Sequence, residues 1–186
     1  MTTTKITKIT KKSRGIPVRK SNHMSTTLTT HDAEVRAHIA KALDWGDAHV
    51  TFEKAVKDLR PELRGKRPDG LPYSAWQLLE HMRLTQHDIL DFCRNPKYVE
   101  MEWPKDYWPA SDAPPSAGAW DESLASFRRD RGALKELAGD TTINLFAKIP
   151  HGTGQTYFRE LVLIIDHNAH HLGQLILVRR LLGAWK

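Results

Sequence analysis

Hydrophobic residues along the first part of the chain recur at intervals of three and four, the spacing of one face of an α-helix. Thr29 or Thr30 can cap such a helix, and the Arg60–Pro61 step ends it, because proline cannot continue a helix. The sequence therefore predicts one continuous helix up to this step. The stripe consists of Val35, Ile39, Ala42, Trp45, His49, Phe52, Val56 and Leu59.

Two more helices are predicted in the middle of the chain. One opens at Ser74-Ala75-Trp76-Gln77, where Ser74 and Gln77 can form a capping box, and Asn95–Pro96 ends it. The next follows a Pro-Pro-Ser break at residues 114–116 and ends at Gly139, which suits a left-handed helix cap.

A last helix is predicted from near Gln155 to Leu182, before Gly183. Alternation of period two is confined to the short piece 144–149, which is too small to form a sheet. Four amphipathic helices in a chain of this size predict an all-α fold, most simply a four-helix bundle. The interior of such bundles is a usual place for metal sites.

Three histidines are the candidate metal ligands. His167 and His171 lie four residues apart in the last helix, so both rings can grip one ion, and His81 on the second helix can complete a three-nitrogen set. Such a site leaves coordination positions open for chemistry. His170 is a competing partner for His167, but the apolar stripe of the helix favours His171. Each histidine taken alone is more often a buried residue bonded to a carbonyl.

Three other residues near these helices have two possible roles. His49 lies on the first stripe, either facing the metal pocket as a proton carrier or substrate contact, or bonded to a backbone carbonyl in the core. Glu160 and Gln174 either hydrogen-bond a ligand histidine or lie at the surface, where Glu160 would pair with Arg159. Asn168 stands where the zinc-protease helix motif needs a glutamate, so that motif is absent.

The link between the second and third helices, residues 96–116, has no helical periodicity but contains Trp103, Tyr107 and Trp108. A link of this length in a compact domain is usually functional or disordered, and aromatic residues argue against disorder. We expect a packed loop that lies over the bundle and covers one end of the site.

Composition limits the protein class. The length of 186 residues suits one domain, and the chain has no run of about 18 apolar residues that would span a membrane. Cys93 is the only cysteine, which excludes an internal disulfide and a thiolate-rich zinc site and favours a cytoplasmic location. Cys93 itself is expected to be a small residue of the hydrophobic core.

The net charge of +6 comes from the N-terminal end. Residues 1–23 carry seven lysines and arginines and no acid, so the rest of the chain has a net charge of −1. We predict a disordered basic tail over residues 1–30 and one domain over 31–186. Met24 is an alternative start, so the tail is either an upstream extension or a basic arm or transit-like segment. A nucleic-acid partner is not expected, because the body of the chain lacks a basic helix.

Three motifs together resemble the DinB-like (YfiT-like) superfamily over residues 31–186. They are Ser74-Ala75-Trp76-Gln77-Leu78-Leu79-Glu80-His81, the aromatic loop from Trp103-Pro104 to Tyr107-Trp108-Pro109, and Asp166-His167-Asn168-Ala169-His170-His171-Leu172-Gly173-Gln174. The resemblance implies an up-down-down-up four-helix bundle, usually dimeric. It also implies one divalent metal, zinc or nickel, held by one histidine of the second helix and two of the last. Those roles fall on His81, His167 and His171.

Two functions are compatible with such a site. The first is a metal-dependent enzyme of the transferase or hydrolase type, which activates a low-molecular-weight thiol or water against a small electrophilic substrate. The second is a metal-loaded bundle without turnover that binds a ligand or acts in a stress response. The lack of a clear general acid or base among the candidate residues favours this second, non-catalytic function.

Overall fold

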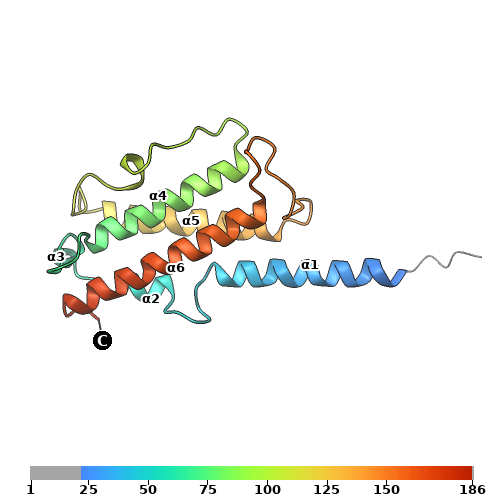
Figure 1. Cartoon of the computed structure of the whole chain (residues 1–186). Coiled ribbons are helices and arrows are strands. Elements are labelled where there is room, and N and C mark those ends of the chain that lie inside the picture. The colour runs from blue at the N-terminus through green and yellow to red at the C-terminus, as the bar shows by residue number, and fades with distance from the viewer. Residues whose placement is uncertain (1–21, 186) are drawn as a thin grey trace, which may run out of the picture.

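Four long helices form the body of the molecule. The computed structural model describes residues 22–185, and its long helices are α1 (Asn22–Ala42), α4 (Ala75–Arg94), α5 (Ala119–Gly139) and α6 (Tyr157–Leu181). Helices α1 and α6 run in one direction and α4 and α5 in the other, which is the predicted up-down-down-up order (Figure 1). No strand occurs among these residues, apart from an isolated bridge between Lys148 and Thr156. The all-α prediction is confirmed.

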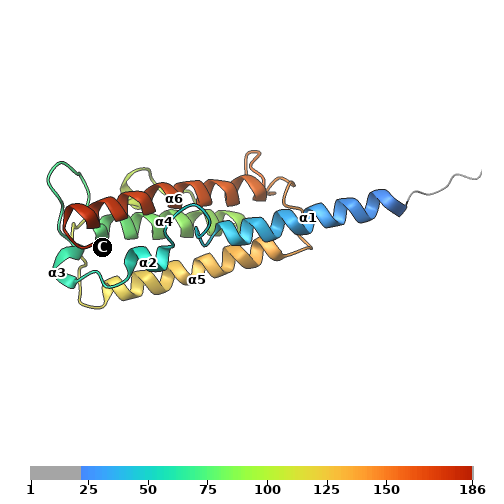
Figure 2. The ribbon, with the colours of Figure 1, turned by 90° about the horizontal axis from the view of Figure 1, so that it is seen from below.

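The prediction of one continuous first helix was wrong. Helix α1 ends at Ala42, and after an irregular segment the short helices α2 (Phe52–Val56) and α3 (Pro61–Arg64) follow. Trp45 adopts a left-handed conformation with φ 56°, which no α-helix permits, and Gly46 next to it is a poor helix former. Figure 2 shows α2 beyond the end of α1, between α5 and α6. Helices α1 and α2 lie one after the other along the same side of the bundle. The apolar residues of both helices therefore face the same core and read in the sequence as one continuous stripe.

The start of the first helix also differs from its prediction. The backbone is already helical at Asn22, before the expected caps at Thr29 and Thr30 and inside the predicted 1–30 tail. A run of threonines has low helix propensity, but each residue added to an existing helix forms one more backbone hydrogen bond. The remainder of that tail, residues 1–21, lies outside the described residues.

Helix α4 begins and ends where the sequence predicts. The Ser74 hydroxyl accepts from the Gln77 amide at 3.2 Å, and the Gln77 side chain accepts from the Ser74 amide at 3.0 Å, so the capping box is complete. Asn95 follows its last residue as the C-cap. Gly139 does not adopt the expected left-handed conformation, because α5 includes it and Asp140 is the cap. Gly183, after α6, does, with φ 67°.

The core runs the length of the bundle, with α4 in contact with both α5 and α6. At the end that contains α2, the buried rings of Phe52 and Phe127 stack with centroids 4.1 Å apart. Helix α6 is the one described helix long and apolar enough to cross a membrane, with a mean hydropathy of 1.2 over its best 18-residue window. Its apolar face lies in the core, where Leu161, Ile164 and Leu175 are fully buried.

We expect Phe127→Ala to lower the free energy of unfolding by about 3–5 kcal/mol, because it empties a ring-sized space in the core. Urea unfolding followed by circular dichroism measures this. Phe146→Ala is the matched control, since its ring is 59% exposed, and it should change stability by less than about 0.5 kcal/mol. Equal effects of the two substitutions would contradict the described core.

Candidate metal centre

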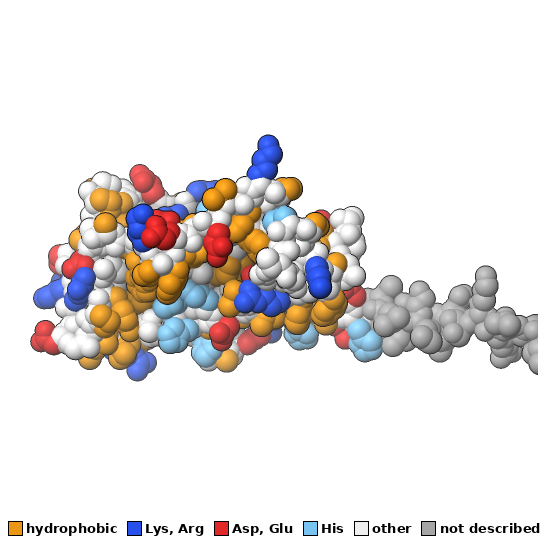
Figure 3. Space-filling model, turned by 45° about the horizontal axis from the view of Figure 1, so that its top comes forward, with side chains coloured by type: hydrophobic (Ala, Val, Ile, Leu, Met, Phe, Trp, Pro, Cys, Tyr) orange, Lys and Arg blue, Asp and Glu red, His pale blue; other side chains and the backbone are white. Residues whose placement is uncertain are grey.

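The three predicted histidines come together on adjacent helices. His81 projects from α4, and His167 and His171 project from successive turns of the antiparallel helix α6. One ring nitrogen from each lies within 4.8 Å of the others. The Nε2 atoms of His81 and His167 are 3.1 Å apart. His81 is buried, whereas His167 and His171 are partly exposed, so the site borders the surface. Several histidine side chains are visible on the face shown in Figure 3.

The outer nitrogen of each ring faces an oxygen. His81 Nδ1 lies 2.8 Å from the Tyr107 carbonyl oxygen, which can only accept, so Nδ1 carries the proton and Nε2 carries a lone pair. His171 Nδ1 lies 2.7 Å from Gln174 Oε1, and His167 Nδ1 lies 3.1 Å from Asn168 Oδ1. This arrangement, with Nδ1–H on an oxygen and Nε2 free, is the one that metal-binding histidines commonly use.

The spacing of these three nitrogens could accommodate a divalent ion. A zinc ion with bonds of about 2.0–2.1 Å in tetrahedral geometry needs ligand nitrogens about 3.3–3.4 Å apart. The Nε2 separation of 3.1 Å between His81 and His167 is close to that value, and all three ligand atoms lie within 4.8 Å. Small side-chain rotations would therefore bring them into register. An ion held by these three imidazoles alone would keep its remaining coordination positions open.

The aromatic loop is packed against the site, as predicted. Its short helix η1 (Lys105–Tyr107) supplies the carbonyl that holds His81. The next residue, Trp108, stacks on the His81 ring with centroids 3.9 Å apart and planes 7° apart. Trp103, whose side chain is 66% exposed, lies with its ring centroid 6.2 Å from that of His81. The loop thus orients the His81 ring from both its edge and its face.

Burial keeps the three imidazoles neutral at physiological pH. Loss of hydration lowers the pKa of His81 to about 4 and that of His171 to about 3. It also lowers the pKa of His167, and the neighbouring rings lower the pKa of His171 further. A metal ligand must be the neutral form, so the rings are ready to bind without releasing protons.

His49 is exposed and is not one of the three histidines whose ring nitrogens lie within 4.8 Å of one another, so the expectation that it faces the metal pocket gains no support. Helix α1 ends before it, so the stripe that placed it inside no longer applies, and its side chain is exposed. It lines a separate hollow of about 310 Å³ with Trp45 and with Val162 of α6. A catalytic role for His49 has no geometric support here.

The structure also places three further residues considered in the sequence: His170, Glu160 and Cys93. His170 is exposed, and its Nε2 accepts from Gln174 Nε2 at 3.1 Å rather than joining the group. Glu160 is buried and pairs with Arg159 at 2.7 Å, so it is not a partner of the ligand histidines. Cys93 is a buried core residue, and burial raises the pKa of its thiol to about 12.

Sequence reasoning considered Gln174, which holds His171, but missed the groups that hold the other two rings. The Tyr107 carbonyl is a backbone atom of a loop and leaves no mark in the sequence. Asn168 stands beside His167, and we interpreted it only as the absence of a protease glutamate. An amide next to a candidate ligand is the signal that would have found it, because its oxygen can hold a histidine N–H.

A comparison with protein-family models places the chain in a family. The model of the DinB superfamily matches residues 45–175, which include all three histidines and helices α2 to α5. The protein belongs to the DinB superfamily. No curated protein and no solved structure matches the chain. In this DinB-superfamily protein, the group of His81, His167 and His171 could bind a metal ion.

We expect the metal-free protein to lose stability as the pH falls from 7 to 5. The unfolded chain takes up protons at its imidazoles near pH 6.5, whereas folded His81 and His171 stay neutral until about pH 4 and 3. Their contribution is therefore constant above pH 6.5 and is lost progressively below it. Thermal melts with a chelator present measure this effect. The double variant His81→Ala/His171→Ala should show a smaller drop in Tm over this range than the wild type. An equal drop would contradict the lowered pKa values of these two histidines.

Proposed function

We propose that this protein binds one divalent metal ion, zinc or nickel, through Nε2 of His81, His167 and His171. We further propose that it is a metal-dependent enzyme that activates a low-molecular-weight thiol or water against a small electrophilic substrate. The supporting observation is the convergence of three neutral imidazoles whose outer nitrogens are held by oxygens. A bound ion of this kind lowers the pKa of a coordinated thiol or water and polarises a substrate oxygen.

The surroundings of the site favour a thiol over water. Among the described residues, the hydrogen-bond partners of the three rings are a carbonyl and two amides, and none is a carboxylate. A coordinating thiol is deprotonated by the ion itself, so it needs no base from the protein. Hydrolysis gains more from a positioned acid or base. We therefore place transfer of a thiol above hydrolysis.

The same observation leaves a second function open. A bundle that holds a metal and binds a ligand without turnover also needs no acid or base beside the site. The homodimer and the cytoplasmic location expected from the sequence remain predictions of this proposal.

Substitution of the ligands tests metal binding. We expect His81→Ala or His171→Ala to weaken zinc binding by more than about 100-fold, because each removes a direct ligand, a loss larger than that of a supporting group. His170→Ala is the matched control, since its ring is adjacent in sequence but outside the group, and it should bind zinc as the wild type does. Competition with a chromophoric chelator gives the affinities. Equal loss in all three variants would mean that the wrong pair on α6 was chosen.

Cobalt substitution separates the two functions. We expect the cobalt-loaded protein to change its visible spectrum when 2-mercaptoethanol is added, because a thiolate enters an open coordination position. A spectrum that changes only with pH would favour activation of water. A spectrum insensitive to thiol and pH would contradict enzymatic activity and favour the binding function.

A further inference from the structure

We propose that Gln86 and Asn168 are positioning residues that fix the tautomer of His167, through a chain of hydrogen bonds that starts at the backbone of α5. This inference rests on the proposed metal site. It assigns a role to two buried amides that touch no substrate and that belong to two different helices.

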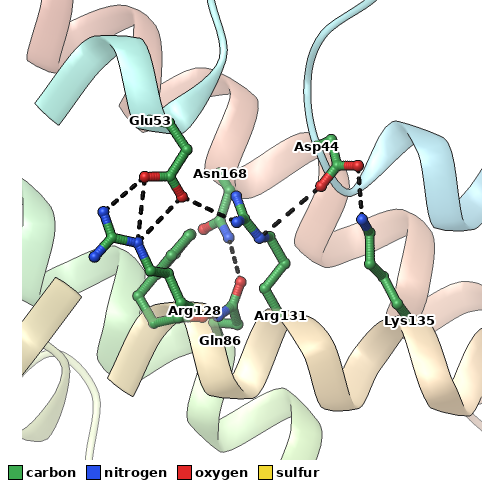
Figure 4. A network of polar contacts seen from close by, with 8 residues as sticks. Asp44, Glu53, Gln86, Arg128, Arg131, Lys135 and Asn168 are labelled. Carbon is green, nitrogen blue, oxygen red and sulfur yellow. Dashed lines mark hydrogen bonds and ion pairs between the residues drawn. The ribbon is translucent and has the colours of Figure 1, made fainter. Parts of the chain in front are cut away.

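The chain of bonds is continuous and almost wholly buried. Gln86 of α4 donates from Nε2 to the Phe127 carbonyl oxygen at 2.8 Å. Asn168 of α6 donates from Nδ2 to Gln86 Oε1 at 3.1 Å, the contact drawn in Figure 4. Asn168 Oδ1 then faces His167 Nδ1 at 3.1 Å. Gln86 is 0% and Asn168 1% exposed, so no solvent can substitute for these partners.

The direction of every bond follows from its first member. A backbone carbonyl can only accept, so the Gln86 amide group must point its nitrogen at Phe127 and its oxygen at Asn168. Asn168 must then present its nitrogen to Gln86 and its oxygen to the histidine. An oxygen can only accept, which places the proton of His167 on Nδ1. The orientation of these amides is therefore determined by chemistry.

The direction of these hydrogen bonds leaves Nε2 of His167 without a proton to donate to His81. A neutral imidazole carries one N–H, and the chain of amides takes it at Nδ1. The Nε2 atom of His167 therefore points a lone pair at His81 Nε2, 3.1 Å away. The Tyr107 carbonyl fixes His81 in the same tautomer. Two lone pairs at this distance repel each other unless a cation lies between them, so the amide chain prepares the site for a metal ion.

The partner of His171 is different. Gln174 is only partly buried, and its amide nitrogen bonds the exposed His170 instead of a backbone carbonyl. His170 can itself rotate and change tautomer, so nothing rigid sets the direction of the Gln174 amide. The anchored ligand on α6 is therefore His167.

The tautomer of His167 in the metal-free protein is the direct test. We expect 15N NMR of the imidazoles at neutral pH to show the proton on Nδ1 in the wild type. In Asn168→Leu we expect it on Nε2, where it can bond His81. Thr85→Val is the matched control, because Thr85 is a buried neighbour of Gln86 whose hydroxyl has no hydrogen-bond partner among the described residues. It should keep the wild-type tautomer.

Zinc affinity is the second measurement. We expect Asn168→Leu and Gln86→Leu to raise the Kd for zinc by about 10- to 100-fold, and Thr85→Val to change it less than about twofold. Circular dichroism identifies any variant that does not fold, and the other variant then decides. A wild type with its proton on Nε2, or the same tautomer in Asn168→Leu, overturns the inference even if zinc binds. If zinc does not bind the wild type, the proposed function fails while the tautomer still tests the amide chain.

Discussion

Helices α4 and α6 pack antiparallel along a seam of fully buried side chains, and the position of every group at the site depends on this contact. Leu79 and Met82 of α4 and Leu172 and Leu175 of α6 belong to the same core cluster. Burial of such side chains is worth about 1.5–3 kcal/mol each, so the seam is far stronger than any single polar contact at the site. It sets His81 opposite two successive turns of α6. The four-residue spacing of His167 and His171 then places both of their rings on the side that faces His81.

The polar groups around the rings work within that apolar frame. A buried N–H must be given to an acceptor, since leaving it unpaired costs free energy. The acceptors here are a loop carbonyl for one ring and amide oxygens for the other two, and all bind Nδ1. The Nε2 lone pairs of the three imidazoles are therefore left free to bind a common ion. Stacking of Trp108 on His81 closes one face of the group and leaves the side near solvent for exchange.

The sequence predicted the features that depend on nearby residues. The capping box at Ser74, the stop at Asn95 and the four-residue spacing of His167 and His171 are all local signals, and the structure contains each of them. The break after Ala42 was missed because α2 continues the same apolar stripe, and periodicity alone cannot tell one helix from two in line. That error put His49 on the inside.

The unpredicted part of the site comes from contacts across long stretches of chain. The bond from His81 to the Tyr107 carbonyl spans 26 residues, and that between Asn168 and Gln86 spans 82. Their existence depends on how the helices pack, which no local pattern contains. In the sequence, Gln86 looks like an ordinary polar residue of a helix. Only its complete burial shows that its amide must find hydrogen-bond partners inside the protein.

X-ray absorption spectroscopy of the zinc-loaded protein tests the central claim most directly. The account predicts a coordination shell with three imidazole nitrogens at about 2.0–2.1 Å and at least one further light ligand that a thiol can replace with sulfur at about 2.3 Å. A protein that retains no zinc after dialysis, or a shell with fewer than three imidazoles, would contradict it.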